Sequence, residues 1–464
     1  MKLKAVYRCQ ECAHESPKWA GQCAGCGAWN SLTEEVVSIG KDAPSARPRA
    51  LTSTSSAVVR LSEAKGEALA RVPTGIAELD GLLGGGVVAG QVLLLAGPPG
   101  IGKSTLMLQA AAGLSGKCKA LYVSGEESLS QVGDRARRLG IEKADITLAS
   151  ETDLDSILKT IADVSPGLIV LDSAQTVFRQ DLPGSPGSVV QVRECSSELL
   201  REAKARGAVL FILGHVTKDG SVAGPKVLEH IVDTVLQFDA EERRMLRILR
   251  AEKNRFGPTS EVGLFEMTQK GLKGVENASA LFLEESAQKS ACGRAVSVTL
   301  EGSRPMLVEV QALVVPTRYP LARRMATGLD INRLFTLVAA LEKHLHLRLD
   351  GHDIFVNIAG GLKVKDPALD LAVCLAIVSS SRERALSHET VFLGEVGLLG
   401  GVGRAGVLDR RLREAERAGF GAAIVDARSA KDLPKSGSRT TLKVLGVEDI
   451  AAAVSQALPE KGSQ

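Results

Sequence analysis

The sequence predicts an α/β protein of several domains, and three observations support this. A glycine-rich segment, residues 97–105, lies between the apolar run 92–95 and an apolar-periodic stretch that begins at Leu106. Two Cys-x-x-Cys pairs lie near the start of the chain, and the apolar pattern changes again from about residue 284. The length of 464 residues exceeds what one ordinary core accommodates, so we expect two or three domains.

The composition excludes several classes of protein. The formal net charge of +3 is small for this length, so any affinity for nucleic acid has to come from local patches. The longest apolar runs have the length of strands and are too short to span a bilayer. Because no hydrophobic signal segment follows Met1, we expect a cytoplasmic protein without membrane contacts.

Four of the eight cysteines form a metal-binding pattern: Cys9, Cys12, Cys23 and Cys26. Each Cys-x-x-Cys pair can place two thiolates on one face of a tight turn, so the four predict a tetrahedral structural Zn²⁺ site. Residues 1–33 are too few to bury a core, and metal binding would supply their folding energy. A redox or disulfide role is disfavoured, because a closed four-thiolate site leaves no open position. What this zinc module contacts, whether DNA, protein or its own domain, stays open.

The composition then shifts to Ser, Ala, Pro, Thr and Arg, which predicts a linker over residues 34–58. The glycine-rich segment 97–105, further along the chain, has the composition of a phosphate-binding loop: Gly97, Pro98, Pro99, Gly100, Ile101, Gly102, Lys103, Ser104 and Thr105. Glycines let backbone N–H groups surround phosphate oxygens, Lys103 reaches the terminal phosphates, and the Ser104 hydroxyl can complete a magnesium shell. The sequence therefore predicts a nucleotide-hydrolysing domain over residues 59–274 that uses ATP and Mg²⁺.

Carboxylates end two of the predicted strands of this domain. The apolar run 168–171 ends in Asp172, which delivers a carboxylate beside the phosphate loop and predicts a second magnesium-binding residue. The run 120–123 leads into Glu126 and Glu127, where a carboxylate is placed to orient the attacking water. The alternative for this pair is an acidic first turn of a helix, favoured by the helix dipole.

The segment RVPTGIAELDGLLGGG, residues 71–86, precedes the phosphate loop as in the RecA-like ATPases, which this part of the chain resembles. The resemblance implies that Glu126 is the catalytic carboxylate, with Glu127 as the alternative. It also gives His215 two readings, a sensor of the terminal phosphate or a structural histidine. In RecA-like rings and filaments, the loops equivalent to residues 216–226 hold single-stranded DNA. This implies DNA contacts by Lys218 and Lys226, against the alternative of ordinary solvated lysines.

The predicted strand 246–252 delivers the pentapeptide Lys253-Asn254-Arg255-Phe256-Gly257. With the phosphate loop and the amino-terminal cysteines, this signature resembles the RadA (Sms) family of bacterial DNA repair proteins over essentially the whole chain. The resemblance implies a homo-hexamer that binds single-stranded and branched DNA and promotes branch migration alongside the RecA recombinase. By similarity to RecA, Lys253 and Arg255 reach the neighbour's nucleotide and join the catalytic set. Binding to DNA or to an internal carboxylate is the alternative.

Residues 285–456 resemble the proteolytic domain of Lon, which implies an α+β domain, and a tail follows over residues 457–464. Ala368, or Leu369 if the register slips by one, stands where Lon has its serine, and Asp409 stands where Lon has its lysine. Without a nucleophile and its base, peptide-bond hydrolysis has no mechanism, so we expect no protease activity.

The expected roles of the Lon-like domain are instead ring scaffolding and DNA binding. Three basic clusters would form its DNA-binding surface: Arg318, Arg323 and Arg324; Lys363 and Lys365; and Arg410, Arg411 and Arg413. Two alternatives to a DNA motor remain for the whole chain. One is a nucleotide-gated ring scaffold that needs no DNA, and the other is an ATP-dependent protease.

Overall fold

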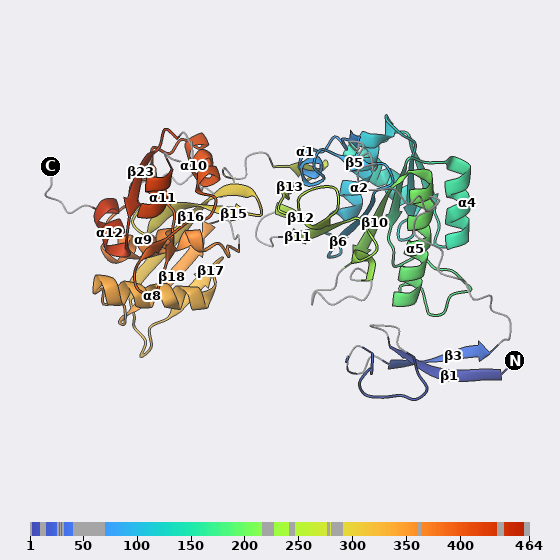
Figure 1. The fold of residues 1–464 in the computed structure, drawn as a ribbon, viewed down its shortest axis with the longest axis horizontal. Helices are drawn as coiled ribbons and strands as arrows, with labels where there is room; N and C mark the ends of the chain where they lie inside the picture. The colour runs from blue at the N-terminus through green and yellow to red at the C-terminus, as the bar shows by residue number, and fades with distance from the viewer. Residues whose placement is uncertain are drawn as a thin grey trace, which may run out of the picture. The chain divides into compact units, whose positions relative to one another are not determined.

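The computed structural model describes residues 2–9, 15–25, 27, 29, 32–39, 70–215, 227–240, 246–275, 279, 291–359, 363–433 and 440–458. Cys12, Cys26, Lys218 and Lys226 therefore lie outside the described residues, as does most of the expected linker. The chain divides into two compact units, of which the first ends at Gly274 (Figure 1). Among the described helices, none combines the length and the hydropathy that a membrane span needs.

The amino-terminal part of the first unit is a small antiparallel sheet. Its strands are β1 (Lys2–Cys9), β2 (Glu15–Ser16) and β3 (Leu32–Ile39), in the order β2-β1-β3. Strand β3 extends past residue 34, where the sequence predicts the start of the linker, because it pairs with β1 along its whole length.

A nine-stranded sheet, in the order β14-β13-β12-β11-β6-β10-β9-β7-β8, forms the centre of the first unit. Strands β6 (Val92–Gly97), β7 (Ala120–Ser124), β8 (Ile146–Ser150), β9 (Leu168–Asp172), β10 (Val209–His215) and β11 (Thr234–Ala240) run parallel. Strands β12 (Leu246–Asn254), β13 (Val262–Thr268) and β14 (Gly271–Gly274) extend it in the antiparallel direction. The carboxyl ends of β6, β7, β9 and β10 thus meet at one edge, where ligands bind in open α/β sheets.

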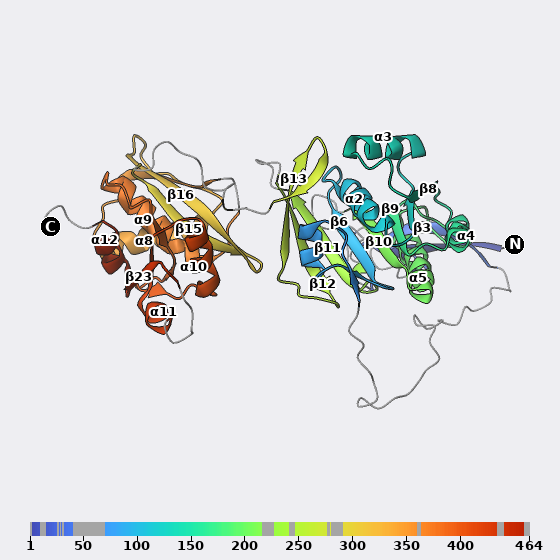
Figure 2. The same cartoon turned by 90° about the horizontal axis from the view of Figure 1, so that it is seen from above.

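Helices cover both faces of this sheet (Figure 2). Strand β6 shows why, since Leu93 and Leu95 enter one apolar cluster while Val92 and Leu94 enter another. The first cluster includes helices α1 (Ala77–Leu82), α2 (Lys103–Ser115) and α3 (Leu129–Leu139). The second includes α4 (Leu154–Val164) and α5 (Val189–Arg206). A short ribbon, β4 (Arg71–Val72) with β5 (Val87–Val88), precedes β6.

The second unit is built on a seven-stranded mixed sheet in the order β17-β18-β16-β15-β19-β22-β23. Its strands are β15 (Arg294–Glu301), β16 (Arg304–Pro316), β17 (Arg324–Thr327), β18 (His352–Ile358), β19 (Thr390–Phe392), β22 (Ala422–Asp426) and β23 (Lys443–Val447). The small pair β20 (Glu395–Val396) and β21 (Val402–Gly403) lies outside it.

The helices of the second unit are α8 (Ile331–Leu345), α9 (Asp370–Ser381), α10 (Leu408–Arg417), α11 (Ala427–Asp432) and α12 (Ile450–Ala457). A 3₁₀ turn, η2 (Pro367–Leu369), leads directly into α9. Asp366 starts this turn, because its carboxylate accepts a hydrogen bond from the Ala368 N–H. Almost every residue of α9 is buried, which explains its uninterrupted apolar sequence.

Candidate active site

The phosphate loop predicted from the sequence connects β6 to α2. Gly100 and Gly102 adopt φ angles of 74° and 114°, in the left-handed region that glycine tolerates. A Cβ on Gly102 would lie 2.8 Å from the Met267 side chain, and one on Gly97 would lie 2.9 Å from Phe238 Cβ. The glycines are therefore required both by backbone conformation and by close packing. Ser104 and Thr105 occupy the first turn of α2 and are half-buried.

Lys103 is the first residue of α2 and only 4% exposed. Its Nζ donates hydrogen bonds to the carbonyl oxygens of Gly97 (2.8 Å) and Pro98 (3.1 Å), and it lies 3.2 Å from Nδ1 of His215. Burial lowers the pKa of Lys103 to about 8, although the charges of Asp172 and Glu126 act in the opposite direction. Lys103 is thus a buried cation at the place where a phosphate-binding loop needs one.

Glu126 lies just beyond the end of β7, next to His215 and Ser173. Its Oε1 lies 2.8 Å from Nε2 of His215 and accepts a hydrogen bond of 2.5 Å from the Ser173 hydroxyl. These hydrogen bonds, that of His215 first, lower the pKa of Glu126 to about 2 against the opposing effect of burial. Because the Lys103 ammonium only donates, Nδ1 of His215 accepts from it and Nε2 carries the hydrogen toward Glu126. His215 thereby bridges the lysine and the carboxylate.

Glu127 lies in a different environment from Glu126. Its Oε1 accepts a hydrogen bond of 2.5 Å from the Arg135 guanidinium on α3. The helix starts at Ser128, whose side chain forms a capping box with Gln131. Of the two glutamates that the sequence leaves open, Glu126 is the one that contacts the groups around Lys103.

Asp172 is the last residue of β9 and only 5% exposed. Its Oδ2 accepts a hydrogen bond of 2.5 Å from the Tyr122 hydroxyl, and its charge acts on Lys103. Burial first and then Asp172 raise the pKa of Tyr122, so the phenol stays protonated. Neither Tyr122 nor Ser173 is predicted as a site residue from the sequence. A hydroxyl in an otherwise aliphatic strand and a serine directly after Asp172 are the signals that point to them.

Lys253 and Arg255 lie away from this group, at the opposite edge of the sheet. Asn254 pairs with Thr234 on β11, which pairs with Leu93 near the start of β6, whereas the phosphate loop follows the end of β6. At about 3.3 Å per residue, that separation is about 13 Å along the strand. The two cations therefore do not join the site of their own chain.

Both cations have partners in their own chain. Lys253 Nζ donates to the carbonyl oxygens of Glu229 (2.7 Å) and Val232 (2.8 Å), and burial together with Arg255 lowers its pKa. Arg255 lies 3.3 Å from the buried carboxylate of Asp233 and remains 57% exposed. Asp233 is thus an internal carboxylate of the kind that the sequence analysis names as the alternative partner.

The amino-terminal module fits a metal in its described part. Cys9 and Cys23 are both 2% exposed and pack in one cluster with Leu32, although they come from separate segments of the chain. The Gly25 N–H donates a hydrogen bond of 3.3 Å to Cys23 Sγ, a kind of contact that orients sulfur ligands in metal sites. Two buried cysteines from separate segments in one cluster suit a zinc ribbon.

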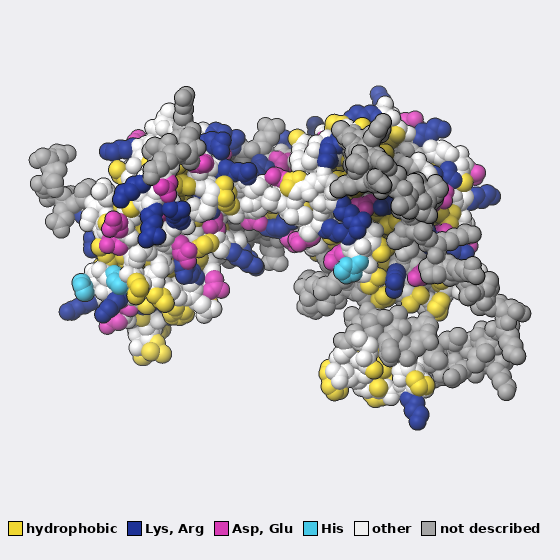
Figure 3. Space-filling view, in the orientation of Figure 1, with side chains coloured by type: hydrophobic (Ala, Val, Ile, Leu, Met, Phe, Trp, Pro, Cys, Tyr) yellow, Lys and Arg dark blue, Asp and Glu magenta, His cyan; other side chains and the backbone are white. Residues whose placement is uncertain are grey.

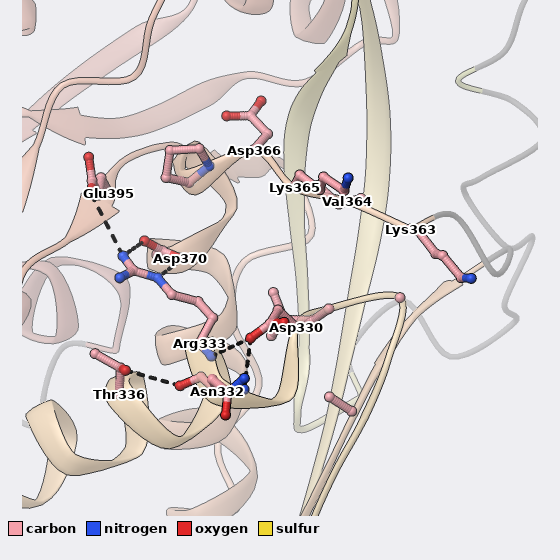
Figure 4. A pocket seen from close by; sticks show the side chains of 14 residues that line it. Asp330, Asn332, Arg333, Thr336, Lys363, Val364, Lys365, Asp366, Asp370 and Glu395 are labelled. Carbon is pink, nitrogen blue, oxygen red and sulfur yellow. Dashed lines mark hydrogen bonds and ion pairs between the residues drawn. The ribbon is translucent and has the colours of Figure 1, made fainter. Parts of the chain in front are cut away.

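The second unit carries no catalytic dyad at the two positions that the Lon resemblance marks. Ala368 lies in η2 and is 2% exposed, and Asp409 lies in the first turn of α10. Beside η2, a cavity of about 820 Å³ is lined by Arg333 and Asp370, which form an ion pair, and by Glu395 (Figure 4). Asp370 is 1% exposed, and burial raises its pKa in spite of Arg333.

The expected basic surface of this unit is only partly present. Arg411 is 2% exposed and donates to the Val298 carbonyl (2.5 Å) and to Asp366 (2.6 Å). The prediction that Arg411 belongs to a basic surface is therefore wrong, because its guanidinium is needed inside the unit. Arg410 and Arg413 are exposed. Lys and Arg side chains are mixed with Asp and Glu on the visible face of this unit (Figure 3).

Comparison with known proteins gives three family matches and many similar chains. Residues 59–221 match an AAA domain, residues 7–34 a rubredoxin metal-binding domain, and residues 332–460 the Lon protease (S16) C-terminal proteolytic domain. The DNA repair protein RadA of Bacillus subtilis is 46% identical over 98% of this chain and 99% of its own. That of Pseudomonas aeruginosa is 47% identical over 98% of each chain. A solved KaiC-like protein from Pyrococcus horikoshii aligns over 45% of this chain and 100% of its own, with 19% identity and a TM-score of 0.38.

The fold and the site define a P-loop ATPase that carries a zinc ribbon at its amino end and a Lon-type domain at its carboxyl end. Nearly half of the residues are identical to those of the two RadA proteins over almost the full length of the chain. The chain belongs to the RadA family of DNA repair proteins. The resemblance and the α/β fold class predicted from the sequence are confirmed.

Proposed function

We propose that this chain is a DNA-dependent ATPase of recombinational repair. It acts as a cytoplasmic hexameric motor that binds single-stranded DNA and promotes branch migration alongside RecA. One observation carries the proposal, namely the contacts that join Lys103 to His215 and His215 to Glu126. His215 ends β10 and directly precedes segment 216–226, which contains Lys218 and Lys226. A DNA strand bound by these lysines would act on the catalytic carboxylate through one histidine.

The proposed roles within the site follow from charge and position. Residues 97–105 surround the phosphates, and Lys103 neutralises their charge. Ser104 and Asp172 would hold Mg²⁺, and the ion would supply positive charge to offset the charge that develops on the phosphate oxygens. Glu126 stays ionised at neutral pH, with a pKa of about 2, and can orient a water molecule for attack. Ser173 and His215 fix the Glu126 carboxylate in place.

Lys253 and Arg255 act on the nucleotide of the neighbouring subunit in this proposal. Their position at the far edge of the sheet supports it, since they cannot reach the phosphate loop of their own chain. Asn254 fixes this segment by donating to the Leu82 carbonyl (3.1 Å) and accepting from the Phe256 N–H (3.0 Å). Cations that act on a neighbour's nucleotide require subunits that contact one another around a ring or along a filament. A hexameric ring meets this requirement.

The Lon-type domain is proposed to be proteolytically inactive and to serve as a scaffold. Ala368 offers no nucleophile, and Asp409 offers no amine to deprotonate one. Burial of Ala368 supports this view, because a serine at 2% exposure would meet no substrate. The family match to a protease domain is the observation that favours the alternative, an ATP-dependent protease.

The decisive experiment measures ATP hydrolysis with and without single-stranded DNA at low and high salt, with casein degradation as a parallel readout. We expect DNA to stimulate hydrolysis, salt to abolish the stimulation, and casein to remain intact. A Lys218→Glu/Lys226→Glu variant should keep its basal rate and lose the stimulation. Turnover that is indifferent to DNA would instead support a nucleotide-gated scaffold, and ATP-dependent casein loss would contradict the inactive Lon-type domain.

A further inference from the structure

Tyr122 places a phenol hydroxyl inside an apolar cluster. The residue is 1% exposed and packs in the cluster on the α2 face of the sheet, together with Ala120, Val132 and Val170. Phenylalanine would fill the same space without the cost of burying a hydroxyl. The hydroxyl therefore needs a partner, and the structure gives it one, Asp172 Oδ2 at 2.5 Å.

Strand register explains how Tyr122 reaches this carboxylate. On the parallel neighbours β7 and β9, Tyr122 pairs with Val170 and Ser124 pairs with Asp172. Tyr122 and Asp172 thus lie on one face, in a diagonal relation that spans about 7–8 Å between backbones. Only a long side chain directed along the strands covers that distance, and the tyrosine ring does so.

The two carboxylate oxygens of Asp172 consequently differ. Oδ2 accepts a hydrogen bond from the Tyr122 hydroxyl, whereas Oδ1 accepts none from the described residues. The hydrogen bond from Tyr122 restricts rotation of the Asp172 carboxylate, because turning the carboxylate would break a charge-assisted hydrogen bond.

We propose that Tyr122 is a positioning residue for magnesium binding, whose hydroxyl fixes Oδ2 of Asp172 and keeps Oδ1 available to the ion or its water shell. This inference rests on the proposed role of Asp172 in holding Mg²⁺. It adds a residue that touches neither nucleotide nor metal and that acts only through Asp172. A purely structural role would affect the stability of the unit and leave metal binding unchanged.

Tyr122→Phe tests the inference, because it removes one hydroxyl and preserves the ring. Binding of a fluorescent ATP analogue to the full chain is measured in EDTA and across a Mg²⁺ titration, and bound Mn²⁺ is followed by electron paramagnetic resonance. We expect the Mg²⁺ concentration for half-maximal effect to rise about tenfold, in line with one charge-assisted hydrogen bond. Affinity in EDTA should stay within about twofold, since residues 97–105 are untouched.

Thr74→Val is the matched control. Thr74 is 0% exposed, its hydroxyl donates to the Asp80 carboxylate (2.8 Å), and neither residue has a proposed role in nucleotide or metal binding. The variant also loses one buried hydroxyl, but its Mg²⁺ requirement should match that of the parent. A Tyr122→Phe protein that is less stable but has the parent's Mg²⁺ and Mn²⁺ affinity would overturn the inference.

Asp172→Asn separates this inference from the proposed function. If Asp172→Asn leaves the Mg²⁺ requirement unchanged, the proposed role of Asp172 fails and the role of Tyr122 fails with it. If Asp172→Asn raises the requirement and Tyr122→Phe does not, the inference alone fails. Because Tyr122 acts through Asp172, the double variant should be no more impaired than Asp172→Asn, and an additive loss would contradict the inference.

Discussion

Each unit of this chain contains a buried aspartate, Asp172 in the first and Asp370 in the second. The two carboxylates differ in the hydrogen bonds that their oxygens accept. Asp172 in the ATPase unit has one oxygen bound by Tyr122, and its charge acts on Lys103. Asp370 in the Lon-type unit has both oxygens bound, by the Arg333 guanidinium and by the Val396 N–H (3.2 Å). One arrangement leaves a polar atom for a ligand, and the other uses its polar atoms to hold the fold.

The cations of the two units differ in the same way. Lys103 is surrounded mainly by neutral carbonyls, and burial lowers its pKa to about 8. Arg333 is hydrogen-bonded to a carboxylate, and that bond raises its pKa. A buried charge that its own chain does not fully compensate favours an anionic ligand, whereas a compensated pair favours only the fold. The comparison therefore separates residues for chemistry from residues for stability.

Lys103→Ala should have the largest effect. Removing the cation that neutralises the phosphates should reduce ATP turnover by about a thousandfold or more, in line with the loss of a principal electrostatic group. Stability should not fall, because the buried ammonium is held by carbonyls rather than by a carboxylate. The measurements are steady-state ATPase rates, thermal unfolding and light scattering for assembly. A normal rate in this variant would remove the central claim about the site.

Arg333→Ala should show the converse. It leaves Asp370 buried without its partner, which should destabilise the Lon-type unit by about 3 kcal/mol. Native-state hydrogen exchange of α8 and α9 measures this loss, while binding of a fluorescent ATP analogue should match the parent. Arg404→Ala is the control, since its pair with Asp432 is 62% and 51% exposed and should contribute less than about 1 kcal/mol. Equal effects of the two substitutions would show that the buried pair has no special role.

Lys253→Ala and Arg255→Ala test whether these two cations act on a nucleotide, as proposed for Lys103, or stabilise the fold, as Arg333 does. If the two residues act on a neighbour's nucleotide, each variant should bind ATP within about twofold of the parent and lose most branch migration. Nucleotide titration, a four-stranded DNA assay and thermal unfolding together decide the matter. Unchanged branch migration with lowered stability would instead give both residues a structural role like that of Arg333.

Sequence reasoning predicted the parts of the molecule that local pattern determines. The phosphate loop, the apolar-periodic stretch from Leu106, and the strands that lead into Glu126 and end at Asp172 follow from glycine spacing and apolar patterns, and the structure has all of them. What pattern cannot give is the partner of a side chain. The burial of Arg411, the bond between Tyr122 and Asp172, and the bridging position of His215 depend on strands that meet only in the fold.

One loop shows the same limit. Pro and Gly interrupt residues 175–191, which indicates a loop and says nothing of its contacts. The structure ties this loop to α5 through Gln191, whose carboxamide bonds the backbone of Arg179, Leu182 and Gly184. A single buried amide satisfies several loop backbone groups, and no periodicity in the sequence signals that contact.

The smallest predicted effect is on pH dependence, and it tests the comparison without changing the fold. Because the pKa of Lys103 is about 8, its cationic form is nearly complete at pH 7 and is lost as the pH rises through 8. ATP affinity should therefore fall about tenfold between pH 7 and pH 9. Glu126, with a pKa of about 2, stays ionised throughout and adds nothing in this range. Isothermal titration of the parent and of Lys103→Ala measures the effect, and the variant should bind weakly with no such slope. If the ATP affinity of Lys103→Ala fell by the same factor between pH 7 and pH 9, the pH dependence would belong to another group. The contrast between an uncompensated Lys103 charge and the paired charge of Arg333 would then fail.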